Sequence, residues 1–392
     1  MNKRSVKDLD VRGKRVLVRV DFNIPIRNGQ VTDDTRIVRA LPTVRYLLEQ
    51  GARPVLISHL GRPKGAPDPE CAMDPVAQRL EELLGAPVLK LDAAVGPEVE
   101  EALATFDDGG VVLLENSRFY PGEAKNDPEF SEQLASLADL YVDDAFAVAH
   151  RAHATTVGVA KLLPAAAGLL MEEELDNLDR VLHTSRHPFV VILGGAKVSD
   201  KLGVIESLLQ VADTLLVGGA MCFTFFKAKG LEIGNSLVED DYLEETGRLM
   251  DEAGDRLVLP TDVVVAEGME EDAPSEVVRV EEIPADLMGL DIGPETVQEF
   301  RGHVVDAKII FWNGPMGVFE VDAFAKGTEG VARAVAQSGA VSIVGGGDSV
   351  AAVRKLGLED RMSFISTGGG ASLEYVEGRE LPGLAVLPEK EA

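Results

Sequence analysis

The strongest chemical signal in this chain is a pair of lysines beside two glycines at the end of an apolar run. Residues 190–201 read Val-Val-Ile-Leu-Gly-Gly-Ala-Lys-Val-Ser-Asp-Lys. The apolar residues are typical of a buried parallel strand, and Gly194 and Gly195 allow a sharp turn with accessible N–H groups. Lys197 and Lys201 lie four residues apart, which suits one polyanion at the start of a helix. An ordinary turn with two solvated lysines explains this segment, taken alone, equally well.

Glycine-rich turns follow four further apolar runs of the second half, at residues 218–220, 313–317, 345–349 and 366–372. Because ligands of parallel sheets bind beyond the carboxyl ends of the strands, five such turns predict a phosphate-rich ligand. Ser199 and Asp200 are expected to cap the helix after the first turn. Asp348 follows three glycines, and its carboxylate is suited either to cap a helix or to hold Mg²⁺ beside a polyphosphate.

Basic and polar side chains follow the strands that we expect in the first half. Arginine has a planar group that matches phosphate and carboxylate, so a set of arginines on one sheet edge predicts a small, highly charged anion. A single arginine is more often paired with a nearby acid such as Asp33 or Glu115, but that explanation fits the whole set poorly. The basic and polar side chains that follow these strands are Asp21, Asn23, Arg36, His59, Arg62, Arg118 and Arg151.

Size and charge restrict the class of protein. A chain of 392 residues suits two domains, and a net charge of −28 argues against general binding of nucleic acid. Only two cysteines are present, which favours a reducing cytosol, and we expect a cytoplasmic protein. The charged start is unlike a secretory signal, and no apolar run approaches the length that spans a membrane.

Short apolar runs alternate with amphipathic segments, which predicts an α/β protein with parallel sheets. We expect a long helix over Pro164–Leu182 to connect the two halves, and further helices at Asp74–Leu84 and Asp127–Ala138. The expected strands of the first half are Arg15–Val20, Pro54–Ser58, Val111–Leu114 and Leu140–Val142; those of the second are Phe189–Leu193, Thr214–Val217, Arg256–Leu259, Lys308–Trp312, Val341–Val344 and Ser363–Ile365.

Several familiar motifs are missing. The sequence lacks G-x-x-x-x-G-K-[ST], so a P-loop enzyme is excluded, and the lack of G-x-G-x-x-G disfavours a dinucleotide-dependent dehydrogenase. The H-R-D and D-F-G segments of protein kinases are absent too.

Over nearly its whole length the chain resembles the phosphoglycerate kinases. In the first half the resemblance is carried by Val-Asp-Phe-Asn-Ile-Pro, Ser-His-Leu-Gly-Arg-Pro, Glu-Asn-Ser-Arg-Phe and Ala-His-Arg-Ala-His-Ala. In the second half it is carried by Leu-Gly-Gly-Ala-Lys-Val-Ser-Asp-Lys, Gly-Gly-Ala-Met, Leu-Glu-Ile-Gly-Asn-Ser, Trp-Asn-Gly-Pro-Met-Gly-Val-Phe-Glu, Gly-Gly-Gly-Asp-Ser and Ser-Thr-Gly-Gly-Gly-Ala-Ser. Many long segments in the family's order are poorly explained by chance.

The resemblance implies a cytoplasmic, monomeric kinase of glycolysis with two Rossmann-like parallel-sheet domains, joined by a long helix and separated by a cleft. It implies 3-phosphoglycerate on residues 1–166, an inter-domain helix at 167–183, a nucleotide domain at 184–375, and a tail, 376–392, that returns to the first domain. The substrate would be held by Asp21, Asn23, Arg36, His59, Arg62, Arg118 and Arg151.

The resemblance further implies ATP or ADP with Mg²⁺ on the second domain, the metal near Asp348. The nucleotide would contact Gly195, Lys197, Lys201, Gly218, Gly219, Gly293, Asn313, Pro315, Glu320, Gly346, Gly347, Asp348 and Ser349. Two departures from the family pattern are Ala220 and the pair Ala147-Val148, which precedes Arg151 and puts the placement of that arginine in question.

The expected reaction moves a phosphoryl group between ATP and the carboxylate of 3-phosphoglycerate. A carboxylate nucleophile has a pKa of about 4 and is already ionised at neutral pH, so no general base is needed. We expect catalysis by alignment and charge neutralisation after domain closure, with Arg36, Lys197 and the N–H groups around Gly369 and Gly370 as catalytic groups.

Three other functions remain open from the sequence. They are another phosphotransferase that forms acyl phosphates on the same fold, a nucleotide-binding regulator without activity, and an NAD-dependent dehydrogenase. The retained arginines and Lys197 disfavour the regulator, and a substrate panel separates the first alternative from 3-phosphoglycerate phosphorylation.

Overall fold

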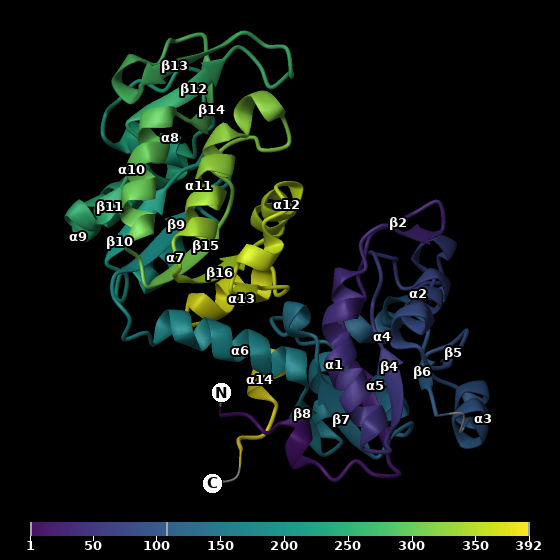
Figure 1. Cartoon of the computed structure of the whole chain (residues 1–392). Coiled ribbons are helices and arrows are strands. Elements are labelled where there is room, and N and C mark those ends of the chain that lie inside the picture. The colour runs from purple at the N-terminus through teal and green to yellow at the C-terminus, as the bar shows by residue number, and fades with distance from the viewer. Residues whose placement is uncertain (1, 107–108, 391–392) are drawn as a thin grey trace. The chain divides into compact units, whose positions relative to one another are not determined.

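The computed structural model describes residues 2–106 and 109–390, which form two compact units (Figure 1). Unit 1 comprises the chain up to Asp176 together with the residues from Glu380, and unit 2 comprises Asn177–Arg379. The boundary between Asp176 and Asn177 falls within helix α6, Leu169–Leu182. Each unit is built around one six-stranded parallel sheet, so the predicted α/β class is confirmed.

The sheet of unit 1 has the strand order β5-β6-β4-β1-β7-β8. Its central strands are almost fully buried and rich in Val, Leu and Ile, as expected for a parallel sheet with helices on its faces. The strands are β1 Arg15–Arg19, β4 Arg53–Ile57, β5 Val88–Lys90, β6 Val111–Leu113, β7 Leu140–Asp143 and β8 Ala165–Ala167; β2 Ile26–Arg27 and β3 Gln30–Val31 form a small hairpin.

Helices connect the strands of unit 1. Helix α2 begins with Asp74-Pro75 and is capped by Gly85, whose φ of 70° is the left-handed conformation that glycine adopts without strain. The helices of this unit are α1 Thr35–Glu49, α2 Asp74–Leu84, α3 Pro97–Thr105, α4 Pro121–Ala124, α5 Pro128–Ala135 and, in the returning tail, α14 Pro382–Ala385.

The segment from residue 164 corrects one prediction. Ala165–Ala167 is not the start of a long helix but the edge strand β8, which pairs in parallel with β7 from Tyr141↔Ala165 to Asp143↔Ala167. Helical periodicity and a buried edge strand of small residues are hard to distinguish over three alanines. The helix begins only at Leu169, where Thr43 Oγ1 accepts the Leu169 N–H at 2.9 Å and Asp144 Oδ1 accepts the Leu170 N–H at 2.9 Å.

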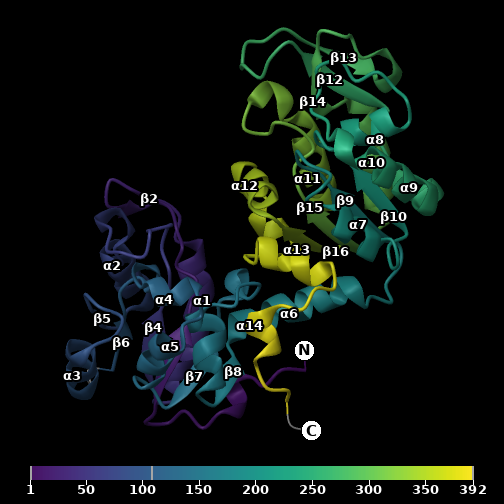
Figure 2. The same cartoon turned by 180° about the vertical axis from the view of Figure 1, so that it is seen from behind.

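Unit 2 has the parallel order β11-β10-β9-β15-β16-β17 and a separate antiparallel sheet, β13-β12-β14, which the sequence reading missed. Figure 2 shows the antiparallel sheet beyond the ends of α10 and α11. The strands are β9 Phe189–Leu193, β10 Thr214–Val217, β11 Leu257–Val258, β12 Asp262–Ala266, β13 Ser275–Arg279, β14 Met288–Ile292, β15 Ile309–Asn313, β16 Val341–Gly345 and β17 Phe364–Ile365.

In unit 2, helices follow several of the turns that come after the strands of the parallel sheet. A core of Val190, Ile192, Ile310, Trp312 and their neighbours holds these helices on the sheet. The helices are α7 Leu202–Leu208, α8 Cys222–Ala228, α9 Leu243–Ala253, α10 Pro294–Val305, α11 Lys326–Gln337, α12 Gly347–Lys355 and α13 Gly370–Val376.

The tail belongs to unit 1. Lys3 and Glu389 form an antiparallel bridge, Arg4 N–H donates to Pro388 O at 2.9 Å, and Gly383 packs so closely on Ala149 that a Cβ would lie 3.0 Å from its Cα. The residues before and after unit 2 therefore fold into one body.

Candidate functional site

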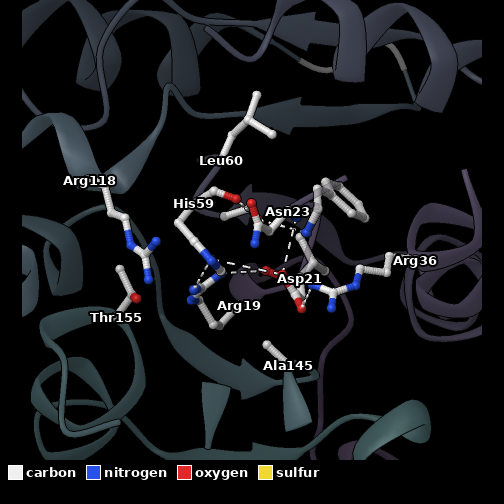
Figure 3. A network of polar contacts seen from close by, with 12 residues as sticks. Arg19, Asp21, Asn23, Arg36, His59, Leu60, Arg118, Ala145 and Thr155 are labelled. Atoms are coloured by element: carbon white, nitrogen blue, oxygen red, sulfur yellow. Dashed lines mark hydrogen bonds and ion pairs between the residues drawn. The ribbon is translucent and has the colours of Figure 1, made fainter. Parts of the chain in front are cut away.

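Arg19, Arg36 and Arg118 surround His59 and are called the arginine cluster of unit 1. The cluster lies where β1, β4, β6 and β7 end. Figure 3 shows Arg36, His59 and Arg118 approaching one region from separate segments, with Arg19 beneath them. Arg19 was missed as a site residue, although it is the last residue of β1 and only 1% exposed. Its guanidinium donates to Val20 O and to His59 Nδ1, the latter at 3.0 Å. An arginine within an apolar run, two residues before Asp21, was the available signal.

His59 is buried and neutral. Burial, followed by the charges of Arg19, Arg118 and Arg36, lowers its pKa well below the usual value. Because arginine only donates, Nδ1 of His59 must accept from Arg19, which leaves the proton on Nε2. The ring therefore offers one N–H donor to an anion without adding a charge.

Asp21 and Asn23 organise the turn after β1. Asp21 is 7% exposed and forms an ion pair with Arg36, whose own side chain remains 33% exposed. Arg36 thus pairs with an acid, Asp21. Asn23 Oδ1 accepts the Gly61 N–H at 2.9 Å, which ties this turn to the loop after β4.

The three remaining predicted arginines differ in their surroundings. Arg118 is partly buried and donates to Gly61 O at 2.6 Å, and desolvation followed by the charge of Arg19 lowers its pKa. Arg151 is exposed, with Nε 2.9 Å from His150 Nε2, and its charge acts on Arg118. Arg62 is exposed, and within residues 2–106 and 109–390 its side chain has no ion pair or hydrogen bond. The structure therefore joins Arg118 and Arg151 electrostatically to the cluster but leaves Arg62 unpaired on its loop.

A second histidine, also missed, lies beside the cluster. Burial, Arg19 and Arg118 lower the pKa of His153 to about 4, so this ring is neutral at pH 7. Its neighbour Glu123 is buried and accepts the Thr155 O–H at 2.6 Å and the Thr155 N–H at 3.0 Å. Ordinary helix and strand patterns carry no signal for such a position.

The phosphate-type site of unit 2 is a cavity of about 390 Å³ at the ends of β9, β15 and β16. It is lined by most of the residues that the sequence predicted for a nucleotide. These are Gly195, Lys197, Lys201, Asn313, Pro315, Gly346, Gly347, Asp348 and Ser349, together with Gly369 and Gly370.

A second, more apolar cavity of about 340 Å³ adjoins the first. Ala196, Pro315 and Asp348 line both cavities, while Gly219 and Glu320 line only the second. Its apolar wall includes Phe223, Met288, Leu290 and Met316, which suits a flat, largely apolar group such as a nucleobase. Gly218 and Gly293 line neither cavity, but a Cβ on Gly218 would lie 2.6 Å from Sδ of Met316, which lines the second.

Glycine is required where two loops of this site approach each other. A Cβ on Gly219, whose φ is +66°, would lie 2.5 Å from Gly195 N, and one on Gly314 would lie 2.2 Å from Gly194 O. The close approach leaves backbone groups, rather than side chains, to form the floor of the site.

The two lysines have different environments. Lys197 is exposed, and no described residue pairs with its ammonium group. Lys201 donates to Asn313 Oδ1; burial lowers its pKa, and the carboxylates of Asp200, Asp348 and Glu377 act in the opposite direction. The expected helix cap is wrong: Ser199 Oγ donates to Glu239 Oε1 at 2.7 Å, and α7 begins after Lys201 without a side-chain cap.

Asp348 is the carboxylate best placed for a metal, at the junction of the two cavities. No group of three or more His, Cys, Asp and Glu that could hold a metal occurs in the described ranges.

Among the helices described, none is long and apolar enough to cross a membrane.

Comparisons with known proteins agree with this geometry. A family model described as phosphoglycerate kinase matches residues 6–379. The phosphoglycerate kinase of Rubrobacter xylanophilus is 75% identical over 391 residues and that of Moorella thermoacetica 56% identical over 393, each covering 100% of both chains. Phosphoglycerate kinase structures from Coxiella burnetii (42% identity, TM-score 0.88) and Pyrococcus horikoshii (35%, 0.85) cover 98% of both chains. On this evidence the chain belongs to the phosphoglycerate kinase family.

Proposed function

We propose how this chain performs the reaction of its family, the reversible transfer of a phosphoryl group between ATP and the carboxylate of 3-phosphoglycerate, which forms 1,3-bisphosphoglycerate and ADP. The arginine cluster of unit 1 supports this proposal most directly. The positive charges of Arg19, Arg36 and Arg118 surround the buried, neutral His59. Such a group of donors suits a phosphorylated carboxylic acid.

Unit 1 is the proposed site of 3-phosphoglycerate. Its phosphate and carboxylate are held by Arg36, Arg62, Arg118 and Arg151, of which Arg62 and Arg151 are exposed. The Nε2–H of His59 donates to the same substrate, and Asp21 orients Arg36 while Asn23 fixes the turn. A neutral histidine adds a directed hydrogen bond where further positive charge would be costly.

Unit 2 is the proposed site of the nucleotide. The base occupies the apolar cavity and the phosphates the cavity beside Lys197 and Lys201. Asp348 would hold Mg²⁺, which would supply positive charge to neutralise the phosphates. Gly218 and Gly293 support this site from outside the two cavities.

Transfer needs alignment rather than proton abstraction, because the attacking carboxylate is ionised at neutral pH. Lys197, which has no hydrogen bond or ion pair with a described residue, is available to the transferring group, and Arg36 supplies the second positive charge. The N–H groups of Gly369 and Gly370 donate to equatorial oxygens. Closure of the two units brings these groups together and excludes water.

A coupled assay tests the proposal, with purified protein, 3-phosphoglycerate, MgATP and a reporter of acyl-phosphate formation. The expected result is strong preference for 3-phosphoglycerate over other small carboxylic acids, and dependence on Mg²⁺. Equal turnover of acetate or another simple carboxylate would indicate a different acyl-phosphate-forming enzyme. We further propose a monomer that works in the cytoplasm, in keeping with its two free cysteines.

A further inference from the structure

The segment that carries Lys197 lies between β9 and α7, and backbone hydrogen bonds hold its first residues. The Gly194 N–H donates to Asn313 O at 3.0 Å, and the Gly195 N–H donates to Pro315 O at 3.0 Å. Lys197 itself is exposed and has no hydrogen bond or ion pair with a described residue. The position of its ammonium group therefore depends on what fixes the segment beyond it.

Glu239 holds the far side of this segment through Ser199. One carboxylate oxygen, Oε2, accepts the Ser199 N–H at 2.9 Å, and the other, Oε1, accepts the Ser199 O–H at 2.7 Å. Lys197 thus lies midway between two anchored residues, Gly195 and Ser199. Because α7 begins without a side-chain cap, the Ser199 hydroxyl is used for this contact rather than for the helix that follows.

Glu239 is itself attached to the interior of unit 2. Its N–H donates to Oγ1 of Thr224 at 3.2 Å, and Thr224 is a residue of α8 that is only 1% exposed. Val198, the residue between Lys197 and Ser199, is completely buried. The backbone after the exposed lysine is therefore connected to the core of the unit.

The carboxylate of Glu239 is ionised, and both of its oxygens are engaged. Burial by itself would raise the pKa of Glu239, but the hydrogen bonds from Ser199 outweigh burial, and the pKa lies below its usual value. The charge of Lys197 contributes to this lowering, although the two described side chains form no ion pair. The acid therefore lies near the lysine while its hydrogen bonds go to Ser199.

We propose that Glu239 is a positioning residue for Lys197, acting through its two hydrogen bonds to Ser199. These bonds fix the backbone beyond the lysine, so that its side chain lines the phosphate-type cavity before a nucleotide is bound. A displacement of about 1 Å in a reacting group can lower a rate about 10²-fold, so loss of these bonds should be visible in turnover. The inference rests on the proposed role of Lys197 in phosphoryl transfer.

The first test removes the contact from each side. Glu239→Ala should lower kcat about tenfold and Ser199→Ala, which keeps the backbone donor, about threefold. Ser199→Thr keeps both donors and should retain the wild-type kcat. The KM for 3-phosphoglycerate should change less than about twofold in all of these variants, because unit 1 is its proposed site. Asp241→Ala, which removes an exposed carboxylate two residues after Glu239, is the control and should leave kcat unchanged.

A double-mutant cycle distinguishes positioning from an independent structural role. If Glu239 acts through Lys197, Glu239→Ala should lower kcat about tenfold in the wild type but less than about twofold in Lys197→Ala. Reductions that multiply would show that Glu239 acts independently of the lysine and would overturn the proposal. A normal kcat of Glu239→Ala beside an impaired Lys197→Ala overturns the role of Glu239 alone, whereas a normal kcat of Lys197→Ala overturns the proposed roles of both residues.

Hydrogen exchange of the full chain without nucleotide gives a readout that does not depend on turnover. The amides of residues 196–199 should exchange about tenfold faster in Glu239→Ala than in the wild type, and at the wild-type rate in Ser199→Thr. The melting temperature should change little, because Glu239 and Ser199 are both partly exposed. Wild-type exchange in Glu239→Ala, or a loss of kcat that only follows a lower melting temperature, overturns the proposal.

Discussion

The candidate sites of the two units are built by different means. The site of unit 1 consists of side chains: Arg36, Arg118 and His59 reach a common region and are fixed by Asp21 and by backbone carbonyls. The site of unit 2 consists mainly of backbone, since glycines bring its turns within van der Waals distance and two lysines supply the charge. Truncating a side chain should therefore damage unit 1, whereas adding a methyl group should damage unit 2.

Lys197→Ala gives the largest expected effect on rate, because this lysine is the exception to the backbone character of unit 2. It is exposed and unpaired among the described residues, so its removal should leave the melting temperature unchanged. Loss of a charge that stabilises the transition state commonly lowers kcat by about 10² or more. The control is Lys229→Ala, which replaces an exposed lysine directly after the end of α8 and is measured by the same steady-state kinetics. Near-normal turnover of Lys197→Ala would refute the assigned role.

Arg36→Ala should reduce turnover to a similar extent and also cost some stability. The substitution leaves Asp21, which is 7% exposed, without its ion-pair partner. Arg36→Lys keeps a charge for Asp21 but not the planar group, so it should recover thermal stability more than activity. The melting temperature and kcat are measured for both variants. If the two quantities fall together in Arg36→Ala and recover together in Arg36→Lys, the role of Arg36 is that of a structural ion pair.

Gly219→Ala tests the backbone construction of unit 2. The new Cβ would meet Gly195 N at 2.5 Å in a left-handed backbone, so we expect a raised KM for ATP and a loss of about 1–3 kcal/mol in unfolding free energy. Gly339→Ala is the matched control, because its φ of +71° is equally unfavourable but no atom lies within 4 Å. If both variants lose the same stability and keep the same KM, close loop packing is not what the glycine provides.

Asp144→Asn should change how stability depends on pH. Burial raises the pKa of Asp144 to about 8, above its value in the unfolded chain, so the folded state binds the extra proton. Asp144 therefore lowers stability progressively as pH rises from about 4 to 8, and the asparagine variant should not. We compare the melting temperature of the variant minus that of the wild type at two pH values. This difference should be a few °C larger at pH 9 than at pH 5. Parallel melting curves across this range would contradict the assignment.

His153 acts in the opposite direction. The pKa of His153 is lowered to about 4, so the unfolded chain takes up its proton first as pH falls below about 6.5. His153→Gln should therefore lose less stability than the wild type between pH 6.5 and 4, as measured by urea titration at each pH.

Tyr375→Phe has the smallest expected effect. The Tyr375 O–H donates to Asp179 Oδ1 at 2.5 Å and joins α13, whose first residue lines the phosphate-type cavity, to α6. Its loss should cost about 1 kcal/mol and change KM for ATP more than kcat. Tyr242→Phe, with no described hydrogen bond from its hydroxyl, is the control. An unchanged KM would show that α13 is held without this bond.

Sequence patterns located the parallel strands well because a strand buried on both faces reads as a continuous apolar run. Phe189–Leu193 and Thr214–Val217 have the predicted bounds. In the antiparallel sheet, β13 is largely exposed and carries no apolar run, whereas the apolar run of the central strand β12 was overlooked. Ala165–Ala167 was misassigned because pairing with β7, rather than local preference, makes it a strand.

The candidate site residues were predicted because they are polar and directly follow the expected strands. Residues within a strand, or on segments behind the sheet, do not fit this pattern and were therefore missed. Arg19 lies inside the apolar run itself, and Glu123 and Thr155 support His153 through contacts between distant segments. Conversely, Gly218 and Gly293 share the local pattern of the site glycines, yet Met316 and Asp262 occupy the space where their side chains would be.

The hydrogen bond between Arg4 and Pro388 has a consequence for biosynthesis. These two residues can meet only after everything between them has left the ribosome, including all of unit 2. Unit 2 is continuous in sequence and is free to fold while the other body still lacks the segment that covers Ala149. The order of translation therefore favours completion of unit 2 first, and a chain cut shortly after Arg379 would have one finished unit and one unfinished unit.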